Sequence, residues 1–141
     1  MKKLLILLTV LFVMLFSEIN AETKRVSSLL QEKLASEVIN PYFNALREGN
    51  VNEIKKYLSE EMYQKNKVLF EQNKEYPTFL QKYYLGAEFS VERAEIIDGV
   101  TVVNVLIAFP NGNSSTSRLK LQKNRDKDGN EVWKIGKPVN E

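Results

Sequence analysis

The sequence predicts an α+β domain in which amino-terminal helices pack on a four-stranded antiparallel meander. Between Val26 and Leu85 the apolar residues recur at helical spacing, whereas from Phe89 onward they alternate with polar residues. Asp-Gly and Asn-Gly turns separate the alternating stretches, as they do in hairpins. Helices followed by strands are the order of an α+β domain, and 141 residues suit a single one.

Residues 1–21 have the three-part layout of a cleavable secretory signal. Lys2 and Lys3 precede an apolar run from Leu4 to Phe16, and Ala21 supplies a small residue before the cut. As a helix this run extends about 20 Å, short of the ~30 Å core of a bilayer, which favours cleavage over an uncleaved anchor. We expect a mature domain over residues 22–141, exported to the periplasm or the exterior of a bacterium without a stable membrane anchor.

The first predicted helix is long and contains a proline. Its apolar stripe extends from Val26 to Leu46, and Pro41 interrupts it. Either Asn40 caps a second helix that starts at Pro41, or one helix kinks there. The stripe keeps its phase across Pro41, which favours the kink. Its members are Val26, Leu29, Leu30, Leu34, Val38, Tyr42, Ala45 and Leu46.

Three shorter helices follow, each with its own boundary signals. Gly49 ends the long helix, and Asn50 with Glu53 predicts a capped helix over residues 51–58. Ser59 caps a third helix. Pro77 opens a last one over residues 78–85, which Gly86 closes.

Four strands are predicted over residues 89–97, 101–109, 115–123 and 132–137. The second is apolar on both faces, with Val103 and Val105 on one and Val102 and Leu106 on the other. It is therefore expected at the centre of the sheet, covered on both sides.

The segment YFNALREGNVNEIKKYLS, residues 42–59, resembles the opening of the nuclear transport factor 2-like superfamily. The resemblance covers residues 38–139 and implies a cone, or cystatin-like fold, with a curved sheet wrapped around the first helix. It is similar to small exported bacterial members of unknown function, many of which are lipoproteins. This chain departs from those because it has no lipid-bearing cysteine.

Two absences limit the chemistry of the chain. It contains no cysteine and no histidine, so it lacks thiolate nucleophiles, zinc–thiolate sites and the commonest general base. Removing Lys2 and Lys3 from 20 basic residues and Glu18 from 18 acidic ones leaves a net charge of +1. Nucleic-acid binding neutralises several phosphates, so we expect no nucleic-acid partner, and no cofactor either.

A metal site and a catalytic site are both weakly supported. Residues 124–129 match half of a calcium loop, but its twelfth position is Ile135 and not Glu, so we expect a hairpin turn and no metal. Isomerases of the superfamily pair a carboxylate base with a tyrosine. Asp98 precedes Gly99 and is expected in a turn, and Glu95 on a solvated strand face. The tyrosines of suitable type are Tyr42, Tyr57, Tyr83 and Tyr84.

The aromatic-rich stretch from Tyr76 to Phe89 either lines the mouth of a pocket or packs between the last helix and the sheet. We take as candidate pocket-lining residues Tyr42, Leu46, Tyr83, Phe89, Val103 and Trp133. They predict a non-enzymatic exported module that holds a small apolar ligand or a protein partner. The resemblance also allows a homodimer through the sheet. The alternative is a small isomerase- or dehydratase-like enzyme using a tyrosine and a carboxylate.

Overall fold

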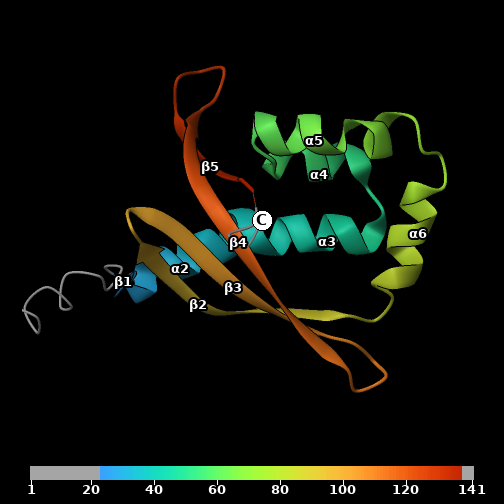
Figure 1. Ribbon diagram of the computed structural model, residues 1–141, viewed down its shortest axis with the longest axis horizontal. Coiled ribbons are helices and arrows are strands. Elements are labelled where there is room, and N and C mark those ends of the chain that lie inside the picture. The colour runs from blue at the N-terminus through green and yellow to red at the C-terminus, as the bar shows by residue number, and fades with distance from the viewer. Residues whose placement is uncertain (1–22, 138–141) are drawn as a thin grey trace, which may run out of the picture.

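The computed structural model describes residues 23–137, which form helices and one curled antiparallel sheet (Figure 1). The sheet has five strands in the order β1-β2-β3-β4-β5, so neighbours in the sequence are neighbours in the sheet. The predicted α+β class and antiparallel meander are confirmed, but the strand number was wrong. The expected signal, residues 1–21, lies outside the described residues.

The additional strand is β1, Thr23–Arg25, which pairs antiparallel with β2 so that Arg25 lies opposite Glu95. Its three residues are all polar and exposed, so no apolar alternation marks it in the sequence. This segment is extended because it pairs with β2, and the amino-acid composition of the segment does not by itself favour a strand.

The long helix consists of α2 (Ser28–Leu34), a π-helical segment η1 (Ala35–Ile39) and α3 (Asn40–Glu48). The backbone N–H of Asn40 donates to the carbonyl of Ala35, five residues earlier. The chain stays helical through Pro41, so Asn40 does not cap a separate helix. A π-helical turn holds more residues than an α-helical one, and the apolar stripe therefore changes phase here.

This change of phase corrects the predicted stripe. Ile39 and Phe43 join Leu34, Val38 and Leu46 in the core. Leu29, expected on the buried side, lies in α2 before this segment and is 76% exposed, while its neighbour Leu30 packs against the core.

The other helices are α4 (Val51–Tyr57), α5 (Glu60–Glu71) and α6 (Tyr76–Tyr83). The predicted caps of α4 and α5 are confirmed, whereas α6 begins and ends two residues earlier than the predicted range of 78–85 and has Tyr84, not Gly86, at its carboxyl end. Gly49 has φ +65°, Asn50 Oδ1 accepts the N–H of Glu53 at 3.1 Å, and Ser59 Oγ accepts that of Met62 at 3.2 Å. Helix boundaries set by such local chemistry can be predicted from the sequence.

The remaining strands are β2 (Glu88–Ile97), β3 (Val100–Ala108), β4 (Ser114–Arg125) and β5 (Glu131–Ile135). The predicted strands agree with them to within two residues at each end. A bulge between Val91 and Arg93 interrupts the register of β2 against β3. Bulges bend and twist a strand, and the sheet curls around the long helix (Figure 1).

The core lies between the long helix and the inner face of the sheet. Val103 and Val105 of β3 are fully buried there, with Ala94 of β2 and Ile135 of β5. Ile54, Leu58 and Leu80 bring α4 and α6 into the same cluster. In contrast, α5 buries none of its residues completely and forms the wall of a more open region.

Candidate functional site

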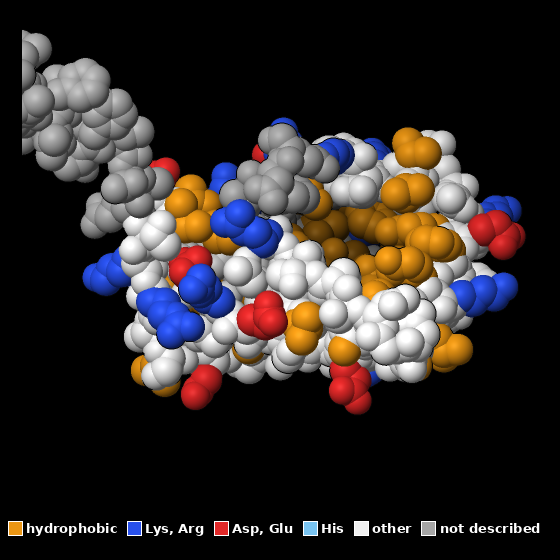
Figure 2. Space-filling view, turned by 60° about the horizontal axis from the view of Figure 1, so that its bottom comes forward, with side chains coloured by type: hydrophobic (Ala, Val, Ile, Leu, Met, Phe, Trp, Pro, Cys, Tyr) orange, Lys and Arg blue, Asp and Glu red, His pale blue; other side chains and the backbone are white. Residues whose placement is uncertain are grey.

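Apolar side chains line a hollow in the half of the molecule that carries α6 (Figure 2). The aromatic rings of this region come from four parts of the fold. They are Tyr42 and Phe43 on α3, Tyr63 and Phe70 on α5, Tyr76, Phe79, Tyr83 and Tyr84 on or next to α6, and Phe89 and Phe109 on or next to the sheet. We call this set the aromatic hollow.

Its rings contact one another in a continuous series. Phe43 stacks on Phe89 with centroids 4.7 Å apart, and Phe89 lies 5.9 Å from Tyr84. From Tyr83 the series continues through Phe79 to Tyr76, and from there to Phe70 on α5. Each aromatic pair contributes about 0.5–1.5 kcal/mol beyond the area it buries, so these contacts hold α5 and α6 against the sheet.

Three phenols lie near one another within this hollow. Tyr42, Tyr76 and Tyr84 are each half-buried, and they come from α3, the start of α6 and its end. Burial raises the pKa of Tyr84 to about 12, with the neighbouring phenols of Tyr83 and Tyr76 adding to the effect. Burial also raises the pKa of Tyr42 well above its ordinary value, and the neighbouring phenols of Tyr84 and Tyr76 raise it further.

The hydroxyl groups of these phenols are not used by the fold. Within residues 23–137, Tyr42, Tyr76 and Tyr84 make ring contacts but no hydrogen bond through their hydroxyls. Each hydroxyl can therefore donate and accept a hydrogen bond with another molecule. The site combines apolar walls with a small number of converging polar groups, as ligand pockets usually do.

Two rings of the aromatic hollow are largely exposed to solvent. Phe79 is 55% exposed and Tyr83 is 53% exposed, four residues apart on α6. They lie on the same side of the helix because of this spacing. Leu85, just beyond α6, is exposed as well.

The structure divides the candidate pocket-lining residues into three groups. Tyr42, Tyr83 and Phe89 lie in the aromatic hollow. Leu46 and Val103 are buried in the core, where neighbouring side chains enclose them. Sequence reasoning did not place Phe70 or Phe109 with this site, because they reach it from distant parts of the chain.

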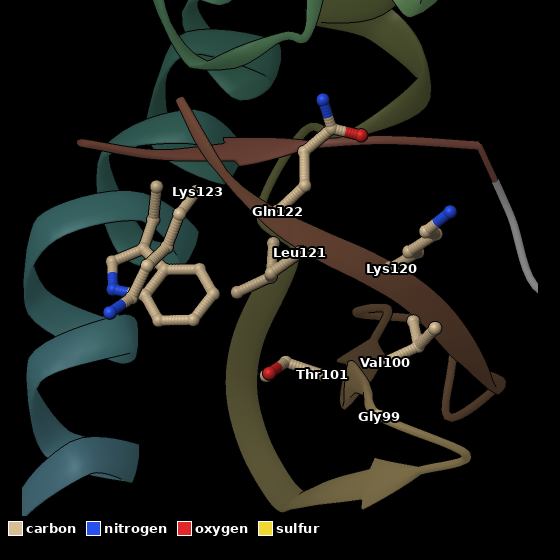
Figure 3. Close-up of a pocket in the computed structure, with 8 residues that line it drawn as sticks. Gly99, Val100, Thr101, Lys120, Leu121, Gln122 and Lys123 are labelled. Atoms are coloured by element: carbon tan, nitrogen blue, oxygen red, sulfur yellow. The ribbon is translucent and has the colours of Figure 1, made fainter. Parts of the chain in front are cut away.

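Trp133 belongs to a different surface. It is half-buried, with Lys123 Nζ 5.4 Å from its ring centroid. It lines an open hollow of about 320 Å³ together with Thr101 and Leu121. Figure 3 shows Thr101 and Leu121 pointing to one side of the sheet and Lys120 to the other.

The carboxylates considered for catalysis lie away from the three phenols. Glu95 is on the outer face of the sheet, only 15% exposed, with Oε1 3.2 Å from Arg93 Nε. Asp98 has φ +50° and lies in the predicted turn with Gly99. The phenol of Tyr57 donates to Glu53 Oε1 at 3.1 Å, and that of Tyr63 donates to Glu71, both on the surface helices α4 and α5.

The half-match to a calcium loop is a hairpin turn, as predicted. Asp126 Oδ1 accepts the backbone N–H groups of Asp128 and Asn130, each at 2.9 Å. These hydrogen bonds, led by the one from Asn130, hold the pKa of Asp126 below its ordinary value. In the part of the chain that the structure describes, no three acidic side chains are grouped so that they could hold a metal ion.

None of the helices within residues 23–137 has both the length and the apolar composition needed to cross a bilayer. Comparison of the chain with known protein families, with curated proteins and with solved structures gave no match.

Proposed function

We propose that this protein is an exported, non-enzymatic binding module whose aromatic hollow holds a small apolar ligand. The observation that carries the proposal is the group of three half-buried phenols with unused hydroxyls inside a ring-lined hollow. A folded chain gains stability by filling such a space with its own side chains. This hollow is instead lined by aromatic rings, and the hydroxyls of its three half-buried phenols have no hydrogen-bond partner within residues 23–137. Such a lining can bind a ligand.

The fold we propose for the module is the cone of the nuclear transport factor 2-like superfamily. The curled antiparallel sheet around a long first helix is compatible with it, and so are the capped second helix and the strand order. The segment over residues 42–59 supports the same assignment. Export and cleavage after Ala21 remain part of the proposal, on the basis of the amino-terminal sequence.

The chemistry of the hollow favours an uncharged ligand with at least one oxygen or nitrogen. The phenyl and phenol rings supply apolar contact, and the three hydroxyls supply hydrogen bonds. The groups that shift the pKa of Tyr42 are burial and other phenols, with no carboxylate or cation among them. A ligand charge buried beside the three phenols would therefore lack a neighbouring counter-ion and would cost several kcal/mol. The cations that contact rings of the hollow, Arg47 and Lys55, lie over Phe89 and Tyr63 instead.

The alternative is an isomerase- or dehydratase-like enzyme, which needs a carboxylate within hydrogen-bond reach of a tyrosine in the hollow. Within residues 23–137 the tyrosine–carboxylate hydrogen bonds are those of Tyr57 and Tyr63. Tyr63 is a ring of the aromatic hollow, but its hydrogen bond to Glu71 lies on the exposed side of α5, and none of the three half-buried phenols has a carboxylate partner in this range. We therefore favour binding over catalysis.

A fluorescent apolar probe, N-phenyl-1-naphthylamine, tests the proposal. We expect its emission to rise on binding to the purified protein, and Phe79→Ala to weaken binding several-fold because this ring forms part of the aromatic hollow. Leu29→Ala is the matched control, since Leu29 is an exposed apolar residue of α2, outside the aromatic hollow. Failure of the probe to bind, or equal loss in both variants, would contradict the proposed site.

A further inference from the structure

The outer face of the sheet carries a group of charged residues that neither the core nor the aromatic hollow uses. Residues directly opposite each other on neighbouring strands point to the same side, and successive rows alternate between faces. Val103 and Leu119 belong to a buried inner row, so the rows on either side of it face outward. These outward rows are Arg25–Glu95–Val102–Lys120 and Arg93–Asn104–Arg118.

The two rows are strongly basic. They hold Arg25, Arg93, Arg118 and Lys120 against the single carboxylate of Glu95, which pairs with Arg93. The ion pair with Lys137 holds the pKa of the Glu61 carboxyl on α5 below its ordinary value, and the charge of Lys120 adds to this effect. The next outward row, Ser90–Leu106–Thr116, carries no charge. Positive charge therefore concentrates around Asn104.

Two polar groups at the centre of these rows have no partner in the described part of the chain. Arg118 is half-buried and makes no ion pair or side-chain hydrogen bond there. The Oδ1 atom of Asn104 is buried and also unpartnered. Leaving a buried polar group unmatched destabilises a fold, and more so when the group is charged.

The side chains around Asn104 also lie close to the sheet. Val102 points outward, yet only 3% of it is exposed. Long charged side chains flank it in these rows, and side chains of this kind lay their apolar stems against a sheet while their charged ends stay at the surface. Charged groups held in this way lose less entropy on binding than free ones.

We propose that the outer sheet face around Asn104 binds an oxyanion, a carboxylate or phosphate group, between Arg93 and Arg118. Paired residues of an antiparallel ladder have Cα atoms about 4.5–5.5 Å apart, so the two arginines flank Asn104 closely enough to reach one group. A guanidinium presents parallel N–H donors that match the oxygens of either anion. The amide nitrogen of Asn104, which is not the buried end of the side chain, adds a donor between them.

The same charges disfavour a homodimer through this face. A two-fold interface would bring the arginines of one copy against those of the other, and like charges placed together are destabilising. An anionic partner removes this repulsion, whereas a second copy would add to it.

The test follows the side-chain N–H signals of arginine and Asn104 by nuclear magnetic resonance while inorganic phosphate or acetate is added to the purified protein. We expect saturable shifts at Arg93, Arg118 and Asn104 with at least one anion. Comparing the phosphate titration with the acetate titration shows whether the site prefers a phosphate or a carboxylate group. Absence of saturable shifts with both anions would overturn the proposal.

Variants separate this site from general attraction to a basic surface. Arg118→Gln should weaken binding roughly fivefold or more, because charge-assisted hydrogen bonds are lost. Arg125→Gln removes the same charge from the far end of β4, where Arg125 lies opposite Glu131 in the strand register, and should change binding less than about twofold. Asn104→Leu should fold normally and bind more weakly, since it replaces an unmatched polar group by an apolar one of similar size. Equal effects of both arginine variants, or self-association of the protein through this face, would overturn the proposal.

Discussion

Tyr42 shows how one side chain can link the stability of the fold to the chemistry of the site. It belongs to the long helix, contacts Phe43 edge-to-face at 5.2 Å, and is half-buried in the aromatic hollow. Its phenol stays protonated well above the ordinary pKa of 10.0, because the protein disfavours the phenolate by burial. At neutral pH it is therefore a hydrogen-bond donor that carries no charge.

The raised pKa predicts a loss of stability at alkaline pH. Above pH 10 the unfolded chain releases a proton that folded Tyr42 retains, so the free energy of unfolding should fall as the pH rises further. Tyr42→Phe should make this fall shallower by up to about 1.4 kcal/mol per pH unit. Urea unfolding between pH 8 and pH 11 measures both slopes. Identical slopes would show that Tyr42 is solvated in the folded protein.

Trp133 is the one tryptophan of the sequence, and its half-burial predicts a moderate effect on stability. We expect Trp133→Ala to lower the free energy of unfolding by about 2 kcal/mol, less than the roughly 3–5 kcal/mol of a fully enclosed aromatic ring. Lys123→Gln removes only the cation over the ring and should cost about 0.5–1 kcal/mol. A loss of 4 kcal/mol or more for Trp133→Ala, on the order seen for enclosed rings, would contradict the half-buried position.

Among the helices, the turn at Gly49 positions α3 against α6. Its φ of +65° already favours glycine, and an added Cβ would lie 2.5 Å from the carbonyl oxygen of Pro77. The turn therefore fixes the approach of the two helices that carry the phenols.

Gly49→Ala should destabilise the protein more than Gly99→Ala. Both glycines have positive φ, so each substitution carries a backbone cost of about 1 kcal/mol, but a Cβ at Gly99 meets open space. We expect Gly49→Ala to cost at least about 1 kcal/mol more, measured by urea unfolding of the two variants. Equal costs would indicate that α6 moves away from the turn without penalty.

Elements with local signals were predictable from the sequence, and those set by tertiary contact were not. Asn50 and Ser59 cap their helices by contacts three residues away, so the spacing alone was sufficient. The π-helical segment before Pro41 shifts the positions of the later buried residues around the helix, and a search for α-helical periodicity cannot detect this shift. Strand β1 depends on pairing with β2, more than 60 residues later in the sequence.

At the scale of the whole molecule, the aromatic hollow was predictable only in part. The stretch from Tyr76 to Phe89 indicated a pocket or a packed surface, and it forms one wall. The other walls come from Phe70 and Phe109, which approach it only when α5 and the end of β3 take their places. The basic outer rows were not predicted, since a bulge in β2 sets which residues face outward.

The proposed signal cleavage gives a further prediction, which concerns the amino terminus of the mature chain. We expect it to begin at Glu22, because Ala21 ends the signal pattern. Amino-terminal sequencing of the exported product tests this directly. A membrane-bound product that still begins at Met1 would contradict it and favour an anchor.

If the chain is exported and cut after Ala21 as proposed, the position of β1 at the very start of the mature chain has a consequence for the order of events. Thr23 is the second residue after the expected cut and already pairs with Ile97. A peptidase has to hold the residues around its cut site in its own cleft, so it competes with β2 for the same short stretch of chain. Processing should therefore come before the edge of the sheet closes, and a domain that folded to completion first would slow its own release from the membrane.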